Sequence, residues 1–257
     1  MWQRFYPKNE RFFLFDKGNV IQNQTTVNEE IDPKYPNEIP VYTGEVNLQG
    51  EKHGFGKLTS VSYEKEGSWR NNKFTGWGRE IKSNGEFFEG KFIDGEISGK
   101  GVYKNNYGDL YIGEFSHSLK HGKGELITPK FRYKGEFNNN RIHGKGKIEF
   151  VEGGHTFEGE FKNNQINGKG IFKWKNGDVY EGEMKNGKMD GFGVFKSENG
   201  FVYEGKFENG VEQGHGKLTY PEGIVFDGIF EDGKPIKGNK RYIKDNKSNC
   251  NRRLVNS

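Results

Sequence analysis

Aromatic residues and glycines recur along this chain at a fixed spacing. The pattern aromatic-x-Gly-x-apolar begins at Tyr42 and returns about every 23 residues. Self-similarity at a period of roughly 20–50 residues is typical of proteins that stack one supersecondary unit on the next. The nine starting positions, taken as position 1 of each unit, are Tyr42, Lys65, Phe88, Tyr111, Tyr133, Phe157, Tyr180, Tyr203 and Phe226.

Within each unit, the alternation of residue types predicts a β-hairpin. Positions 1 and 5 are mostly aromatic, and position 3 is always glycine. Because side chains alternate along a strand, these three positions share one face. Positions 8 and 9 are turn residues, as in Asn163-Asn164 and Asn186-Gly187. A turn centred there places position 5 opposite 12, position 3 opposite 14 and position 1 opposite 16.

Position 16 tests this register, because it is apolar in units three to eight. These residues are Tyr103, Leu126, Ile148, Phe172, Phe195 and Leu218. The glycines leave room for the rings to lie flat on the backbone. On the other face, positions 4 and 13 are expected to pair opposite charges as Glu114–Lys123, Glu136–Lys145 and Glu160–Lys169. The second repeat departs from the pattern, with Lys65 at position 1 and Glu80 at position 16. Sequence drift or a partner contact would explain this.

Composition supports an all-β fold with a thin core. The chain has 39 glycines, 22 phenylalanines and 12 tyrosines but no alanine. It is therefore poor in helix formers and rich in residues that favour pleated strands and turns. Its hydrophobic content of 31% is low for a compact globule of 257 residues. The expected fold is an elongated, single-layer, twisted antiparallel sheet of successive hairpins.

The repeat resembles the MORN repeat. The resemblance is carried by Tyr-Glu-Gly-Glu-Met-Lys-Asn-Gly at 180–187 and Tyr-Glu-Gly-Lys-Phe-Glu-Asn-Gly at 203–210, each followed by Gly-x-Gly and a second turn. It covers about residues 41–238, with the ninth unit partial. It implies the elongated sheet described above. Proteins similar in repeat content include radial spoke head components of cilia and junctional membrane tethers.

Two segments lie outside the repeats. Residues 1–40 form an aromatic, proline-rich arm that either caps the first hairpin or anchors the chain on another protein. Its anchor candidates are Trp2, Phe5, Tyr6, Phe12, Phe13 and Phe15. Residues 239–257 form a basic tail, expected to be disordered or to contact an acidic filament or anionic lipid. Its candidates are Lys240, Arg241, Lys244, Lys247, Arg252 and Arg253.

The sequence shows no arrangement of residues that indicates catalysis. Cys250 is the only cysteine, and His121 and His143 fall at the same repeat position, which indicates turn architecture rather than metal binding. Gly-Lys-Gly recurs, but without the Walker spacing that a phosphate loop needs. We therefore expect no enzyme activity, no cofactor and no metal. The body is slightly acidic, so nucleic acid is not expected as a partner.

The function predicted from the sequence is a structural scaffold for protein–protein interaction. We expect a cytoplasmic protein of the cytoskeleton, in a ciliary axoneme, with other proteins of a large assembly and further copies of itself as partners. The alternative is a peripheral membrane tether with weak contact to anionic lipid. The predicted interaction face consists of Tyr111, Phe115, Tyr133, Phe137, Phe157, Phe161, Tyr180, Tyr203 and Phe207.

Overall fold

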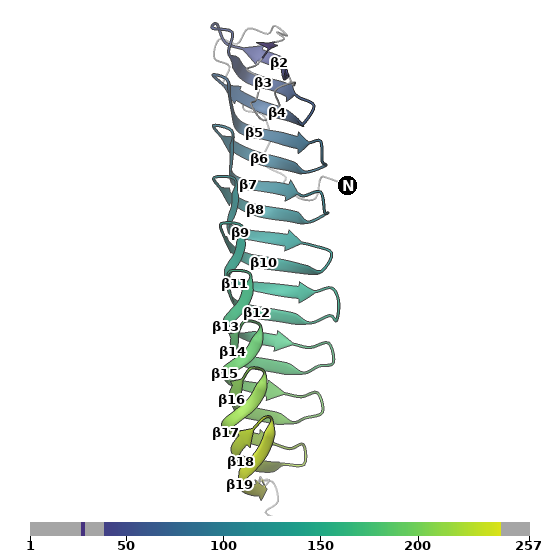
Figure 1. The fold of residues 1–257 in the computed structure, drawn as a ribbon, viewed down its shortest axis with the longest axis vertical. Coiled ribbons are helices and arrows are strands. Elements are labelled where there is room, and N and C mark those ends of the chain that lie inside the picture. The colour runs from purple at the N-terminus through teal and green to yellow at the C-terminus, as the bar shows by residue number, and fades with distance from the viewer. Residues whose placement is uncertain (1–26, 29–38, 243–257) are drawn as a thin grey trace, which may run out of the picture. The chain divides into compact units, whose positions relative to one another are not determined.

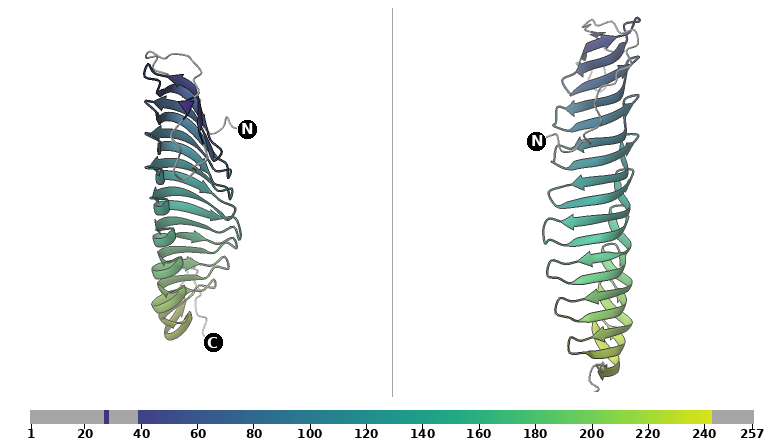
Figure 2. Two further views of the ribbon diagram at one scale, coloured as in Figure 1. Left: turned by 45° about the horizontal axis from the view of Figure 1, so that its top comes forward. Right: turned by 180° about the vertical axis from the view of Figure 1, so that it is seen from behind.

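A computed structural model describes residues 27–28 and 39–242. The chain divides into two compact units, residues 1–126 and 127–257, and each is described by itself. The described residues contain strands and turns and no helix. Figure 1 shows the strands in chain order, and Figure 2 shows them from two further directions.

In the first unit, each strand lies beside the one before it. Pairing is antiparallel from the first strand to the eighth, and the ring of Tyr111 against Gly124 places the ninth beside the eighth. The strands are β1 (Val27–Asn28), β2 (Val41–Val46), β3 (Lys52–Thr59), β4 (Tyr63–Arg70), β5 (Lys73–Lys82), β6 (Phe87–Ile93), β7 (Glu96–Lys104), β8 (Leu110–Ser116) and β9 (Leu119–Ile127).

The second unit repeats this arrangement. Each strand pairs antiparallel with the next. Within each unit, the predicted all-β fold of successive antiparallel hairpins is thus confirmed. The strands are β10 (Phe131–Asn138), β11 (Arg141–Phe150), β12 (Thr156–Lys162), β13 (Gln165–Lys173), β14 (Val179–Lys185), β15 (Lys188–Lys196), β16 (Val202–Glu208), β17 (Val211–Thr219), β18 (Ile224–Glu231) and β19 (Lys234–Tyr242).

The predicted register is correct at two of its three pairs. In the sixth repeat, Phe157 lies opposite Phe172 and Gly159 opposite Gly170, as positions 1–16 and 3–14 require. The expected pairing of position 5 with 12 is wrong. Phe161 lies opposite Ile166 at position 10, because a β-bulge shifts the register between positions 3 and 5. Position 12 pairs instead with position 5 of the following hairpin.

The same bulge overturns the charge pairs expected within each hairpin. Lys145 lies opposite Glu160, and Lys169 opposite Glu183, so each lysine faces the glutamate of the next repeat. Within the sixth hairpin, the Glu160 carboxylate accepts a hydrogen bond from the backbone N–H of Lys169 at 3.3 Å. The equivalent Glu114 accepts from the backbone N–H of Lys123 at 3.4 Å. In these two hairpins the position 4 glutamate therefore accepts a backbone hydrogen bond across its own bulge, and it does not pair with the lysine side chain expected in the same hairpin.

Rings and glycines of the same repeat form the core. The Phe157 ring lies against Gly159 and Gly170, where a Cβ atom would come within 2.6 and 2.4 Å of it. Phe157 also meets the Phe161 ring edge-on, at 5.4 Å between centroids. Contacts of this kind follow the chain within each unit and bury both rings of most repeats. The core is therefore a line of rings on one face of the sheet.

The second repeat keeps this arrangement despite its unusual residues. Lys65 and Glu80 lie opposite each other and form an ion pair at 3.7 Å. The ring of Phe74, from the second strand of the hairpin, lies against Gly67 and Gly78 in place of the missing position 1 ring. The two departures from the pattern thus compensate for each other inside the protein.

The C-terminal boundary expected at residue 238 lies inside a strand. β19 continues to Tyr242, because Asn239 pairs with Asp227 and Tyr242 with Ile224. The first four residues assigned to the tail are therefore part of the sheet.

Candidate protein-binding surface

The nine rings predicted as an interaction face belong to the core. None of them is more than 6% exposed, because the glycine pairs and neighbouring rings enclose them. A partner cannot reach these side chains without displacing the repeat's own packing. The accessible surface of the sheet is its other face, which carries the even-numbered positions of the first strand.

The terminal candidates lie mostly beyond the described residues. Trp2, Phe5, Tyr6, Phe12, Phe13 and Phe15 are outside this part of the chain, and so are Lys244, Lys247, Arg252 and Arg253. Lys240 and Arg241 are exposed on β19.

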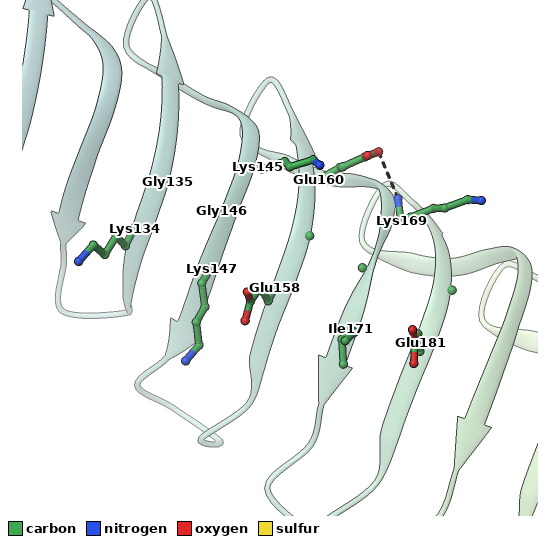
Figure 3. Close-up of a pocket in the computed structure, with 13 residues that line it drawn as sticks. Lys134, Gly135, Lys145, Gly146, Lys147, Glu158, Glu160, Lys169, Ile171 and Glu181 are labelled. Atoms are coloured by element: carbon green, nitrogen blue, oxygen red, sulfur yellow. Dashed lines mark hydrogen bonds between the residues drawn. The ribbon is translucent and has the colours of Figure 1, made fainter.

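A groove crosses five strands on the outer face of the second unit (Figure 3). It has a volume of about 670 Å³ and uses the central residues of β10 to β14. Its floor is backbone, because positions 3 and 14 face the ring side of the sheet and present only their main chain to this side. The floor residues are Gly135, Gly146, Gly159, Gly170 and Gly182.

Two rows of side chains form the walls of this groove. Positions 4 and 13 supply one wall, and positions 2 and 15 supply the other, since both sets alternate with the buried ring positions. The first wall is formed by Lys145, Glu160 and Lys169 (Figure 3). The second wall is formed by Lys134, Lys147, Glu158, Ile171 and Glu181 (Figure 3).

The β10–β11 end of the groove carries three lysines. The β12–β14 part carries both signs, with Glu158, Glu160 and Glu181 beside Lys169. Lys147 forms an ion pair with Glu149 at 2.9 Å, and hydrogen bonding within this pair raises the pKa of Lys147 and lowers that of Glu149. Lys169 lies 4.0 Å from Glu183. Within the described residues, Glu158 and Glu181 form no ion pair or hydrogen bond.

Sequence reasoning missed the aromatic side chains on this face. Phe192, on β15, is 68% exposed and lies between the two glycines of a Gly-x-Gly pair. Phe55 and Trp77 lie between the corresponding glycines of the first two repeats and are also exposed. The alternation could have found them, because the residue between two inward-facing glycines must point outward.

Residues 27–28 and 39–242 contain no group of three His, Cys, Asp or Glu side chains placed to hold a metal ion. The same residues form no helix that could span a bilayer.

Comparison with known proteins identifies a repeat family and similar solved structures. The MORN repeat model matches residues 42–64, 66–87, 88–106, 111–130, 133–155, 157–179, 180–202 and 203–225. The chain is also similar to the SAS-4 (dCPAP) TCP domain of Drosophila melanogaster, solved in complex with a proline-rich motif of Ana2 (dSTIL). That likeness has 12% sequence identity and a TM-score of 0.37, and covers 67% of this chain and 88% of the TCP domain chain.

Proposed function

The chain belongs to the MORN repeat family, and from this premise we propose that it is a non-catalytic scaffold that binds other proteins. MORN repeats are protein–protein or membrane–lipid interaction modules. The groove over β10 to β14 supports the protein-binding role, because it combines a backbone floor with charged and apolar walls. Such a surface suits an extended segment of a partner chain.

The groove can be tested by comparing the partners of the full chain with those of two variants. Ile171→Glu places a charge on the groove wall, whereas Val151→Glu places one at an exposed turn outside the groove. Affinity purification with quantitative mass spectrometry should show proteins that Ile171→Glu loses and Val151→Glu retains. Identical recovery with both variants would argue against the groove as the binding surface.

We place this scaffold in a cytoskeletal assembly, and specifically in a ciliary axoneme. The support is a chain that is almost entirely repeat, together with a family used for interaction rather than catalysis. A tagged copy expressed in ciliated cells should remain with the axoneme after detergent extraction. A copy found only in the soluble fraction would contradict this placement.

A membrane-tethering role is the second candidate, and β19 favours it. This strand carries Lys234, Lys237, Lys240 and Arg241 and no acidic residue, and its Ile236 and Tyr242 are 58% and 75% exposed. Cations beside exposed apolar groups suit an anionic membrane surface. Co-sedimentation with phosphatidylserine vesicles at physiological salt tests it, and no difference from neutral vesicles would exclude it.

Self-association is a further proposal. Among the described residues, β19 pairs only with β18, so its other edge is available to a strand from a second copy. Sedimentation at micromolar concentration should then show species larger than the monomer. A monomer at every concentration would exclude this contact.

A further inference from the structure

We propose that residues 1–26 fold back over the outer face of the first unit and pack on a patch of apolar side chains between β3 and β8. This surface is separate from the groove of the second unit, and the proposed scaffold function does not depend on it. Three features support the contact: the placement of the apolar side chains, the point at which the segment joins the sheet, and the aromatic composition of the segment.

Apolar side chains gather on the outer face of the first unit, at positions that alternate with the buried rings. Four of them form cross-strand pairs, with Ile81 opposite Phe87 and Val102 opposite Ile112. Each side chain of the group is exposed or half-buried. We call the group the outer apolar patch, and it consists of Phe55, Trp77, Ile81, Phe87, Val102 and Ile112.

The same face of the second unit begins with charged residues instead. The residue between the paired glycines is Phe55 or Trp77 in the outer apolar patch, and these are 37% and 40% exposed. In the first two repeats of the second unit, the residue at this place is Lys145 or Lys169. A solvated outer face is therefore compatible with the repeat, and apolar residues are not required there for the hairpin to form. An apolar patch on such a face marks a contact surface.

The segment before Val27 joins the sheet beside this face. β1 pairs with β2, with Val27 opposite Tyr42 and Asn28 opposite Val41, so the preceding residues start at the edge of the first hairpin. From β2 to β8 the face extends over about 29 Å, at about 4.8 Å between neighbouring strands. The 26 residues before Val27 span up to about 85 Å when extended. The segment is therefore long enough to cross the whole patch.

The composition of the segment suits the outer face rather than the ring face. On the ring face, Tyr42, Trp69, Phe74, Phe88 and Phe92 are at most 5% exposed, because they pack on one another and on the glycines. Aromatic side chains of the segment therefore find accessible apolar partners on the outer apolar patch. The segment supplies six of them: Trp2, Phe5, Tyr6, Phe12, Phe13 and Phe15.

The covalent link favours this segment over a separate partner. A segment joined to its site by a short linker is present there at an effective concentration in the millimolar range. A second copy of the chain at micromolar concentration therefore competes about a thousandfold less well for the same contacts. Residues 1–26 thus occupy the outer apolar patch of their own chain, beyond the first hairpin that they were expected to cap.

Photocrosslinking of the full chain tests the contact. Benzoylphenylalanine in place of Phe5, or of Phe12 in a second variant, should crosslink to peptides from β3 to β8. A mixture of unlabelled and isotope-labelled chains shows whether each crosslink lies within one chain or joins two. Crosslinks within one chain to these strands are the expected result. Crosslinks between chains, crosslinks only to other strands, or no crosslink from either position would overturn the proposal.

A matched pair of substitutions tests the patch itself. Trp77→Glu places a charge in the outer apolar patch, and Phe192→Glu places one at the same repeat position in the second unit, where Phe192 is 68% exposed. The first should lower the crosslink yield about fivefold or more, because burying a charge without a partner is unfavourable. The second should leave the yield unchanged.

Equal yields from Trp77→Glu and Phe192→Glu would refute the patch as the docking site. Both side chains point away from the rings, so the sheet should be retained, and far-ultraviolet circular dichroism checks this. If Trp77→Glu lost its strand signal, the position of the crosslinks in the chain with an intact patch would decide the question. Loss of protein partners in Ile171→Glu has no bearing on this result, since Ile171 lies in the groove of the second unit.

Discussion

Tyrosine at position 1 repairs a defect that the β-bulge creates. The register shift leaves the carbonyl of position 4 outside the strand ladder, and the tyrosine hydroxyl of the same repeat donates to it. This bond is 2.7 Å long from Tyr180 to Glu183, and it recurs from Tyr42, Tyr111 and Tyr133. The tyrosine ring therefore packs in the core, and its hydroxyl satisfies a backbone carbonyl.

Tyr180→Phe should lower the free energy of unfolding by about 1 kcal/mol, because the Glu183 carbonyl loses its donor. Chemical denaturation measures the change. Tyr220→Phe is the control, since the Tyr220 hydroxyl makes no hydrogen bond within the described residues. A loss of equal size in both variants would assign the effect to something other than this bond.

Gly170→Ala should lower the free energy of unfolding by about 1–3 kcal/mol, because its Cβ would meet the Phe157 ring at 2.4 Å. Differential scanning calorimetry of Gly170→Ala beside Phe157→Ala and the double variant measures it. The alanine at 170 should cost less once the ring is gone. Additive losses would show that the ring is not what excludes the side chain.

At the scale of the element, hydrogen bonds link the hairpin turn to the preceding repeat. The Asn164 backbone N–H donates to the Ile142 carbonyl at 2.9 Å, and the Asn164 side-chain oxygen accepts from the Ile142 N–H at 2.8 Å. Gly187 occupies the equivalent turn position and makes only the backbone bond, to Ile166 at 3.0 Å. At this turn position asparagine therefore makes two hydrogen bonds to the neighbouring repeat, whereas glycine makes one.

Gly187→Asn should raise the free energy of unfolding by about 0.5–1 kcal/mol. Its φ of 78° is one that asparagine accepts, no atom lies within 4 Å of the new Cβ, and the Ile166 N–H gains an acceptor. Urea denaturation measures the gain, and Asn164→Gly should show a loss of similar size. Stabilisation by Gly187→Ala as well would show that the acceptor is not its source.

At the scale of the whole molecule, the sequence predicted the hairpins better than it predicted their exposed surfaces. Alternation and turn residues specified the pairs 1–16 and 3–14, which depend only on local pattern. The bulge was missed because nothing in the sequence distinguishes Glu160 from an ordinary strand residue. In the structure its carboxylate accepts a hydrogen bond from the Lys169 backbone N–H across the bulge. The aromatic side chains were predicted to contact a partner protein, because sequence alone does not show that they pack on one another. The rings of Tyr180 and Phe207, for example, lie with their centroids 5.1 Å apart.

Alkaline pH should unfold the protein through its buried tyrosines. Burial raises the pKa of Tyr133, Tyr180 and Tyr203 to about 12, from 10.0. Between pH 10 and 12 the unfolded chain therefore binds fewer protons than the folded one, so stability falls as pH rises. Ultraviolet absorbance of tyrosinate and far-ultraviolet circular dichroism should change together in this range. Ionisation of these three groups without loss of strand signal would contradict the prediction.

Strand pairing within the second unit has a mechanical consequence. Neighbouring strands join side by side, so their hydrogen bonds run in the direction in which the repeats follow one another. A pull in that direction loads the boundaries between strands in series, and the weakest opens first. Each repeat that opens releases about 23 residues, or about 75 Å of slack. Under tension the unit should therefore extend in small steps, one repeat at a time, and limit the force that reaches a bound partner.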